Sequence, residues 1–92
     1  MTYEITGLEK REWKNKTNRL YVDFNGYNLC FLQKVNKNKG MGEKTVERLI
    51  SNEILFPVLE RHNYTIKDLI GKRCIIKRNR VYILEFDLAE PS

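Results

Sequence analysis

The sequence contains few of the residues from which catalytic and metal sites are usually built. It has one histidine, His62, and two cysteines, Cys30 and Cys74, which are far apart and form no Cys-x-x-Cys spacing. The acidic residues show no metal-ligand spacing, and no motif places a nucleophile beside His62. We therefore expect no enzyme, cofactor or metal site. We expect His62 to close a helix end and both cysteines to act as small buried hydrophobic residues.

Long apolar runs are also absent. No stretch of about 18 apolar residues exists, which excludes a membrane-spanning helix. The first residues, MTYEITGLEKRE, mix charges from the start and lack the apolar segment of a signal peptide. No repeat or interdomain linker interrupts the 92 residues. We expect one cytoplasmic domain over residues 1–88, a flexible tail over 89–92, and no membrane partner.

Positive charge is in excess and unevenly distributed. The chain has 17 lysines and arginines against 12 acidic residues, a net charge of +5. Most of the basic residues fall in three segments, residues 10–19, 34–44 and 72–80, where Glu12 and Glu43 are the only acids. Such clusters indicate an anionic partner, although solvated loops that confer solubility have the same composition.

The first half of the chain has the alternation typical of strands. Residues 3–13 predict a long strand with a bulge or bend at Gly7, followed by a polar loop over 13–19. RLYVDF and YNLCFLQ then alternate on either side of Asn25-Gly26, a pair typical of a type I′ hairpin turn. This register would place six residues on one core face: Leu20, Val22, Phe24, Tyr27, Leu29 and Phe31.

The second half predicts helices and then a closing hairpin. Apolar residues with a 3.6-residue period predict a helix from about Glu43, interrupted near Pro57. Thr65 predicts the N-cap of a short helix that stops at Gly71. RCIIK at 73–77 and VYILEFD at 81–87 predict two strands joined by a tight turn.

This order of elements favours a mainly β fold, a five-stranded OB-fold-like barrel with a helix between strands 3 and 4. An SH3-like barrel and an open α+β sheet with one packed helix are the alternatives. Ligands of OB-folds lie on strands 2 and 3, between the loops that join strands 1–2 and 4–5. The three basic clusters would then surround one groove.

A groove for single-stranded nucleic acid needs cations for phosphates and flat rings for bases. The candidate stacking residues are Trp13, Tyr21 and Tyr82. The candidate phosphate contacts are Lys14, Lys16, Arg19, Lys37, Lys39, Arg73, Lys77, Arg78 and Arg80.

Two segments carry a resemblance to a known family, YEITGLEKREWKNKTNRLYVDF and DLIGKRCIIKRNRVYILEFD. With its basic first hairpin and its Gly-Lys before a closing hairpin, the chain resembles the small OB-fold single-stranded-DNA-binding proteins of phages and mobile elements. The resemblance implies non-enzymatic protection of a DNA strand during replication or recombination.

Other partners remain open at this point. The basic surface also fits a protein-interaction module, such as a mobile-element inhibitor of a host nucleic-acid enzyme. Double-stranded DNA or structured RNA is a third kind of ligand. The sequence does not distinguish single-stranded DNA from RNA.

Overall fold

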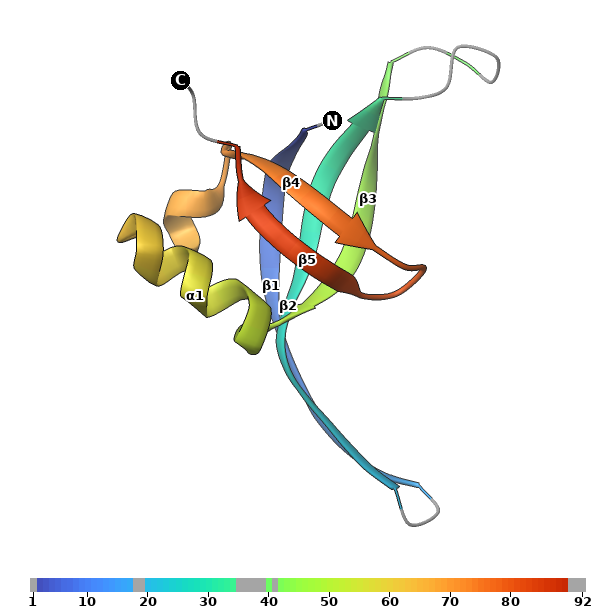
Figure 1. Ribbon diagram of the computed structural model, residues 1–92. Helices are drawn as coiled ribbons and strands as arrows, with labels where there is room; N and C mark the ends of the chain where they lie inside the picture. Colours follow the sequence, from blue (N-terminus) through green and yellow to red (C-terminus); the bar gives the residue numbers. More distant parts are fainter. Residues whose placement is uncertain (1, 18–19, 35–39, 41, 90–92) are drawn as a thin grey trace.

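A computed structural model of the protein describes residues 2–17, 20–34, 40 and 42–89. The described chain is mainly β, with one five-stranded antiparallel sheet of order β3-β2-β1-β4-β5 and one α-helix (Figure 1). No helix in these residues is long and apolar enough to cross a membrane. The elements are β1 (Tyr3–Thr17), β2 (Leu20–Lys34), β3 (Glu43–Ser51), α1 (Asn52–His62), the 3-10 helix η1 (Ile66–Leu69), β4 (Arg73–Arg78) and β5 (Ile83–Leu88).

Strands β1 and β2 form one long hairpin. Their register runs from Glu4 opposite Leu32 to Thr17 opposite Leu20, with a bulge beside Gly7 as predicted. β3 accompanies β2 only as far as Gly26, which lies opposite Ser51. The hairpin beyond that point, residues 11–25, projects away from the body (Figure 1). We call this projection the arm. Residues 18–19 lie outside the described residues.

Two predictions about this hairpin are wrong. Residues 13–17 are strand rather than polar loop, and residues 25–26 are strand rather than turn. Neither Asn25 nor Gly26 has the positive φ that a type I′ turn requires. Gly26 is instead a site of close approach, because a Cβ there would lie 2.1 Å from the Ile50 carbonyl oxygen and 2.9 Å from Ser51 Cα. Asn25-Gly26 has the sequence of a hairpin turn, although Gly26 is required for close packing against β3.

The predicted start of the helix is also wrong. Residues 43–51 form strand β3, paired with β2 along its whole length, and α1 begins only at Asn52. Val46 and Ile50 are both buried and four residues apart, a spacing that fits a helix face and a strand face equally well. Residues 43–51 form a strand because they pair with β2, and this pairing is not visible in the sequence.

Pro57 does not interrupt α1, contrary to expectation, and the helix continues to His62. Pro57 is the sixth residue of the helix, so it removes one intrahelical hydrogen bond. Burial of Leu55, Val58 and Leu59 against the core offsets that loss. His62 ends the helix as predicted, followed by Asn63 in the left-handed conformation.

The remaining elements agree with the prediction. The Thr65 N–H donates to Asp68 Oδ2 at 2.8 Å at the start of η1, which holds the pKa of Asp68 below its ordinary value. Gly71 has φ of 85°, which favours glycine at this stop. Strands β4 and β5 follow as a hairpin. Ala89 donates its N–H to the Arg73 carbonyl at 2.9 Å, and residues 90–92 of the expected tail lie outside the described residues.

The core lies between the curled sheet and α1. Its fully buried members come from every element of the body: Ile5, Leu29, Phe31, Ile50, Leu55, Leu69, Cys74 and Ile83. Leu29 and Phe31 are core residues as expected, and Tyr27 packs partly buried against them. Phe24 is buried but does not join this core, because a continuous strand through residues 25–26 turns it to the opposite face.

The two edge strands approach each other without forming a ladder. β3 is linked to the residue just before β5 by one parallel bridge, Leu49 to Tyr82, beside which the Leu49 N–H donates to the Val81 carbonyl at 2.8 Å. We call the line between β3 and the β4–β5 hairpin the seam. The mainly β fold with five strands and a helix between the third and fourth is confirmed, although predicted strands 2 and 3 were both parts of β2. The sheet is not closed into a barrel by a continuous ladder.

Candidate functional site

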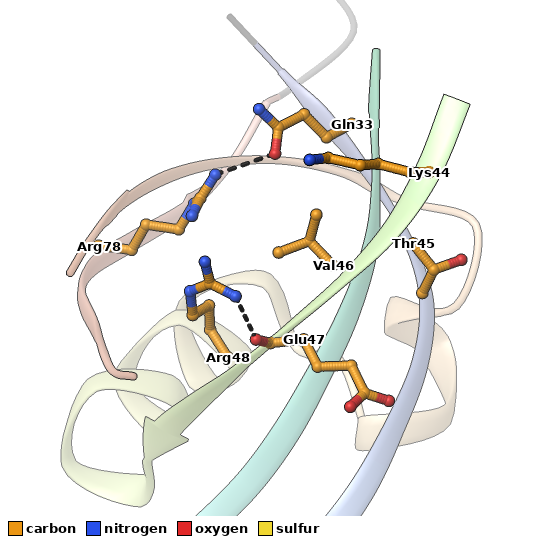
Figure 2. Close-up of a pocket in the computed structure, with 7 residues that line it drawn as sticks. All are labelled: Gln33, Lys44, Thr45, Val46, Glu47, Arg48 and Arg78. Carbon is orange, nitrogen blue, oxygen red and sulfur yellow. Dashed lines mark hydrogen bonds between the residues drawn. The ribbon is translucent and has the colours of Figure 1, made fainter. Parts of the chain in front are cut away.

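An open pocket of about 710 Å³ lies at the seam, beside the parallel bridge. We call it the seam pocket. Its lining comes from β2, β3 and the end of β4: Gln33, Lys44, Thr45, Val46, Glu47, Arg48 and Arg78. Lys44 and Arg48 alternate with buried Val46 and Ile50 in β3, so they share the face that carries the core. Figure 2 shows their nitrogen atoms extending toward the same space as Arg78.

Neutral groups hold both arginines of the seam pocket. Arg78 Nη2 donates to Gln33 Oε1 at 3.0 Å, and its guanidinium lies 5.5 Å from the centre of the Phe31 ring (Figure 2). Arg48 Nε donates to the Asn79 carbonyl at 3.2 Å, and Arg48 Nη1 donates to the Glu47 carbonyl at 2.6 Å. These contacts fix the position of both guanidinium groups and leave their charge uncompensated.

The acidic residue of the pocket points elsewhere. The Glu47 carboxylate turns away from the arginines (Figure 2) and accepts a hydrogen bond from Cys30 Sγ at 3.5 Å. Partial burial and this carboxylate together raise the pKa of the Cys30 thiol. Among the described residues, none of the ion pairs involves Lys44, Arg48 or Arg78. The pocket is therefore a concentration of positive charge.

Three aromatic rings join the base of the arm to the β4–β5 hairpin. Trp13 stacks on Phe24 with ring centres 4.5 Å apart, and Phe24 lies 6.0 Å from Tyr82 in a tilted arrangement. Phe24 is buried, Trp13 is half-buried, and Tyr82 is 36% exposed. We call these three residues the aromatic cluster. Because Tyr82 bridges to Leu49, next to Arg48, the cluster adjoins the seam pocket.

The turn between β4 and β5 is organised by Asn79. Its Oδ1 accepts from the N–H groups of Val81 at 2.9 Å and Tyr82 at 2.7 Å, and its own N–H donates to the Tyr82 carbonyl at 2.9 Å. Arg80 is exposed in this turn, and Lys77 is exposed on β4 just before it. The turn thus holds exposed cations close to the aromatic cluster.

The structure brings together some of the predicted site residues. Lys77, Arg78, Arg80 and Tyr82 gather around the β4–β5 turn, and Trp13 reaches them through Phe24. Lys14 is exposed on the arm. Arg73 lies at the other end of β4, where it donates to Thr2 Oγ1 at 3.2 Å.

Two further predicted residues, Lys16 and Tyr21, lie on the arm. The backbones of Lys16 and Tyr21 pair across the arm, whereas their side chains are outside the description. Arg19, Lys37 and Lys39 lie outside the described residues altogether.

The sequence-based site missed Gln33 and Arg48, and it counted Lys44 only as part of a cluster. The cause is the helix predicted over this segment, which hid the alternation of Lys44, Val46, Arg48 and Ile50. That alternation, with Thr45 and Val46 as β-branched residues, was the available signal for a strand.

Comparisons with protein-family models, with curated proteins and with solved structures found no match. The described residues include no group of three or more histidine, cysteine or acidic side chains able to hold a metal ion.

Proposed function

We propose that the protein is an OB-type barrel that binds single-stranded nucleic acid, chiefly DNA, without catalysing a reaction. The binding surface would run along the seam, from the base of the arm past the β4–β5 turn to the seam pocket. As the sequence resemblance implies, such a protein would coat or protect strands during replication or recombination.

The observation that carries this proposal is the meeting of Lys44, Arg48 and Arg78 in one pocket. These residues are up to 34 positions apart in the chain, yet their charges face one open space lined in part by Val46. No carboxylate among the described residues pairs with them. Phosphate groups of a polynucleotide would supply the missing negative charge.

The aromatic cluster supports a strand whose bases are unpaired. Trp13 and Tyr82 present partly exposed rings beside the cations, and a ring stacked on a base contributes about 1–3 kcal/mol. The sheet order and the parallel contact of β3 with the start of β5 support the OB-type interpretation.

The experiment is a titration of labelled oligo-dT at low and moderate salt. We expect binding to weaken with salt. A plot of the logarithm of the association constant against the logarithm of the salt concentration should have a slope of about −2 or steeper, since each neutralised phosphate of a single strand contributes about −0.7. Competition with RNA and duplex DNA identifies the preferred form. Absence of binding at low salt, or binding that is insensitive to salt, would refute the proposal.

One observation favours a second candidate, a protein-interaction module. Ile75 and Leu84 of the β4–β5 hairpin are 51% and 52% exposed, although both are large apolar residues. A protein partner could cover them, as an inhibitor of a host nucleic-acid enzyme would require. Pull-down from nuclease-treated lysate decides between the candidates, because a stoichiometric protein that survives nuclease and is lost on I75K substitution supports this one.

A further inference from the structure

We propose that the seam pocket is a discrete phosphate site, in which one phosphate group of the bound strand replaces solvent between Arg48 and Arg78. This inference rests on the proposed function for the identity of the ligand. It adds that binding is concentrated at one pre-built position and is not spread evenly over the basic surface.

The two guanidinium groups approach the pocket from opposite sides of the seam. Arg48 rises from β3, and Arg78 comes from the end of β4 (Figure 2). Arg48 donates to the carbonyls of Asn79 and Glu47, and Arg78 donates to Gln33 Oε1. A guanidinium has five N–H donors, so donors remain on both for a phosphate. Lys44 adds a third charge on the same face.

The supports of the two arginines make the site rigid before any ligand binds. The Phe31 ring beneath Arg78 is fully buried, and the Asn79 carbonyl that holds Arg48 belongs to the turn organised by the Asn79 side chain. Guanidinium groups held in place favour phosphate, because two N–H groups of one arginine have the spacing needed to donate to two phosphate oxygens at once. A lysine in place of either arginine keeps the charge but not this geometry.

Gln33 supplies a sharp test, because its side chain already touches Arg78. Substitution Gln33→Glu is isosteric and would place a carboxylate where the amide oxygen accepts from Arg78. We expect the new ion pair to leave the fold intact, with an unchanged or higher Tm. The introduced carboxylate would neutralise the Arg78 guanidinium in place of a phosphate. The charge-matched control is Lys67→Gln, an exposed residue of η1 away from the seam.

A second pair of variants separates geometry from charge. Arg78→Lys removes the forked guanidinium from the seam pocket at constant charge, and Arg61→Lys makes the same change at an exposed position of α1. Affinity for an oligo-dT of about 15 nucleotides is measured for all four variants, with Tm as the folding control. We expect Q33E to weaken binding by about tenfold and R78K by about fivefold, with K67Q and R61K within about twofold of wild type.

A titration of the full chain with inorganic phosphate gives a readout that needs no oligonucleotide. We expect a saturable NMR shift of the Gln33 side-chain amide that R78K loses and K67Q keeps. If Q33E and R78K bind oligo-dT like their controls, the seam pocket is not a phosphate site, although the proposed function stands. If wild type binds no oligonucleotide, the proposed function falls, and the phosphate titration alone then decides for or against the site.

Discussion

Gly26 and Gly7 lie on the same long hairpin but have different surroundings. A Cβ at Gly26 would meet backbone atoms of Ile50 and Ser51 within 3 Å, whereas a Cβ at Gly7 would meet Cys30 Cβ at 3.8 Å, an ordinary contact. We expect Gly26→Ala to lower the free energy of unfolding by about 3 kcal/mol, because the β3 backbone must move away. Gly7→Ala should change it by less than about 1 kcal/mol. Urea unfolding of the two variants checks this. Equal effects would contradict the close approach.

Cys74 makes stability depend on alkaline pH. Burial in the core raises the pKa of its thiol from 9.0 to about 12. The stabilisation from keeping this thiol neutral is complete below pH 9 and is lost as the pH rises toward 12, since the unfolded chain ionises first. Stability should therefore fall more steeply over this range in wild type than in Cys74→Ala. Thermal unfolding at a series of pH values measures the difference, and parallel curves would exclude the effect.

The aromatic cluster is the element-scale link between the arm and the body. Phe24→Ala should lower the free energy of unfolding by about 3 kcal/mol, because a buried ring that touches two others is removed. It should also shift the fluorescence of Trp13, the only tryptophan, to longer wavelength as its stacked face meets water. Phe56→Ala is the control, since Phe56 is 41% exposed on α1 and should leave the Trp13 emission unchanged. Unaltered emission in F24A would argue against the stack.

The β4–β5 turn is the element that brings β5 to β3. Asn79→Ala removes the acceptor of two turn N–H groups, so the turn should loosen and the Leu49–Val81 hydrogen bond should open more often. Hydrogen exchange at the Leu49 amide should accelerate by about tenfold. Arg80→Ala, in the same turn but exposed, provides the comparison and should leave that amide protected. Equal exchange in both variants would show that Asn79 does not organise the seam.

At the scale of the whole molecule, the arm and the body are separable. Among residues 11–14 and 23–25 of the arm, whose side chains the structure describes, none belongs to the core cluster. Replacing residues 14–23 by Asn-Gly keeps Trp13 opposite Phe24 and supplies a favoured hairpin turn. We expect Tm within about 5 °C of wild type and an affinity for oligo-dT several-fold lower, since three basic residues are lost.

A variant with Lys14, Lys16 and Arg19 changed to glutamine keeps the arm at full length. It should lose as much affinity as the shortened chain if charge is the contribution of the arm. A shortened chain that unfolds would show that the arm stabilises the body.

Local signals were sufficient where a feature depends on neighbours in sequence. The bulge at Gly7, the capping of η1 by Thr65 and Asp68, the stop at Gly71 and the β4–β5 hairpin all belong to this class. The prediction of secondary structure was wrong at two places where the same local sequence pattern fits two conformations. Asn25-Gly26 fits a turn or a strand under a close neighbour, and the 43–51 segment fits a helix or a strand.

The sequence by itself determined a mainly β chain, its short helix η1, its closing β4–β5 hairpin and its excess of positive charge, since these follow from periodicity, capping and turn residues and composition. The tertiary structure alone decided that residues 20–34 are one strand, that Gly26 is a contact residue and that Gln33, Lys44, Arg48 and Arg78 share a pocket. The physical reason is that hydrogen bonding between strands is non-local. Because residues 43–51 pair with β2, they form a strand and not a helix. The alternation of side chains along this strand directs Lys44 and Arg48 toward the seam.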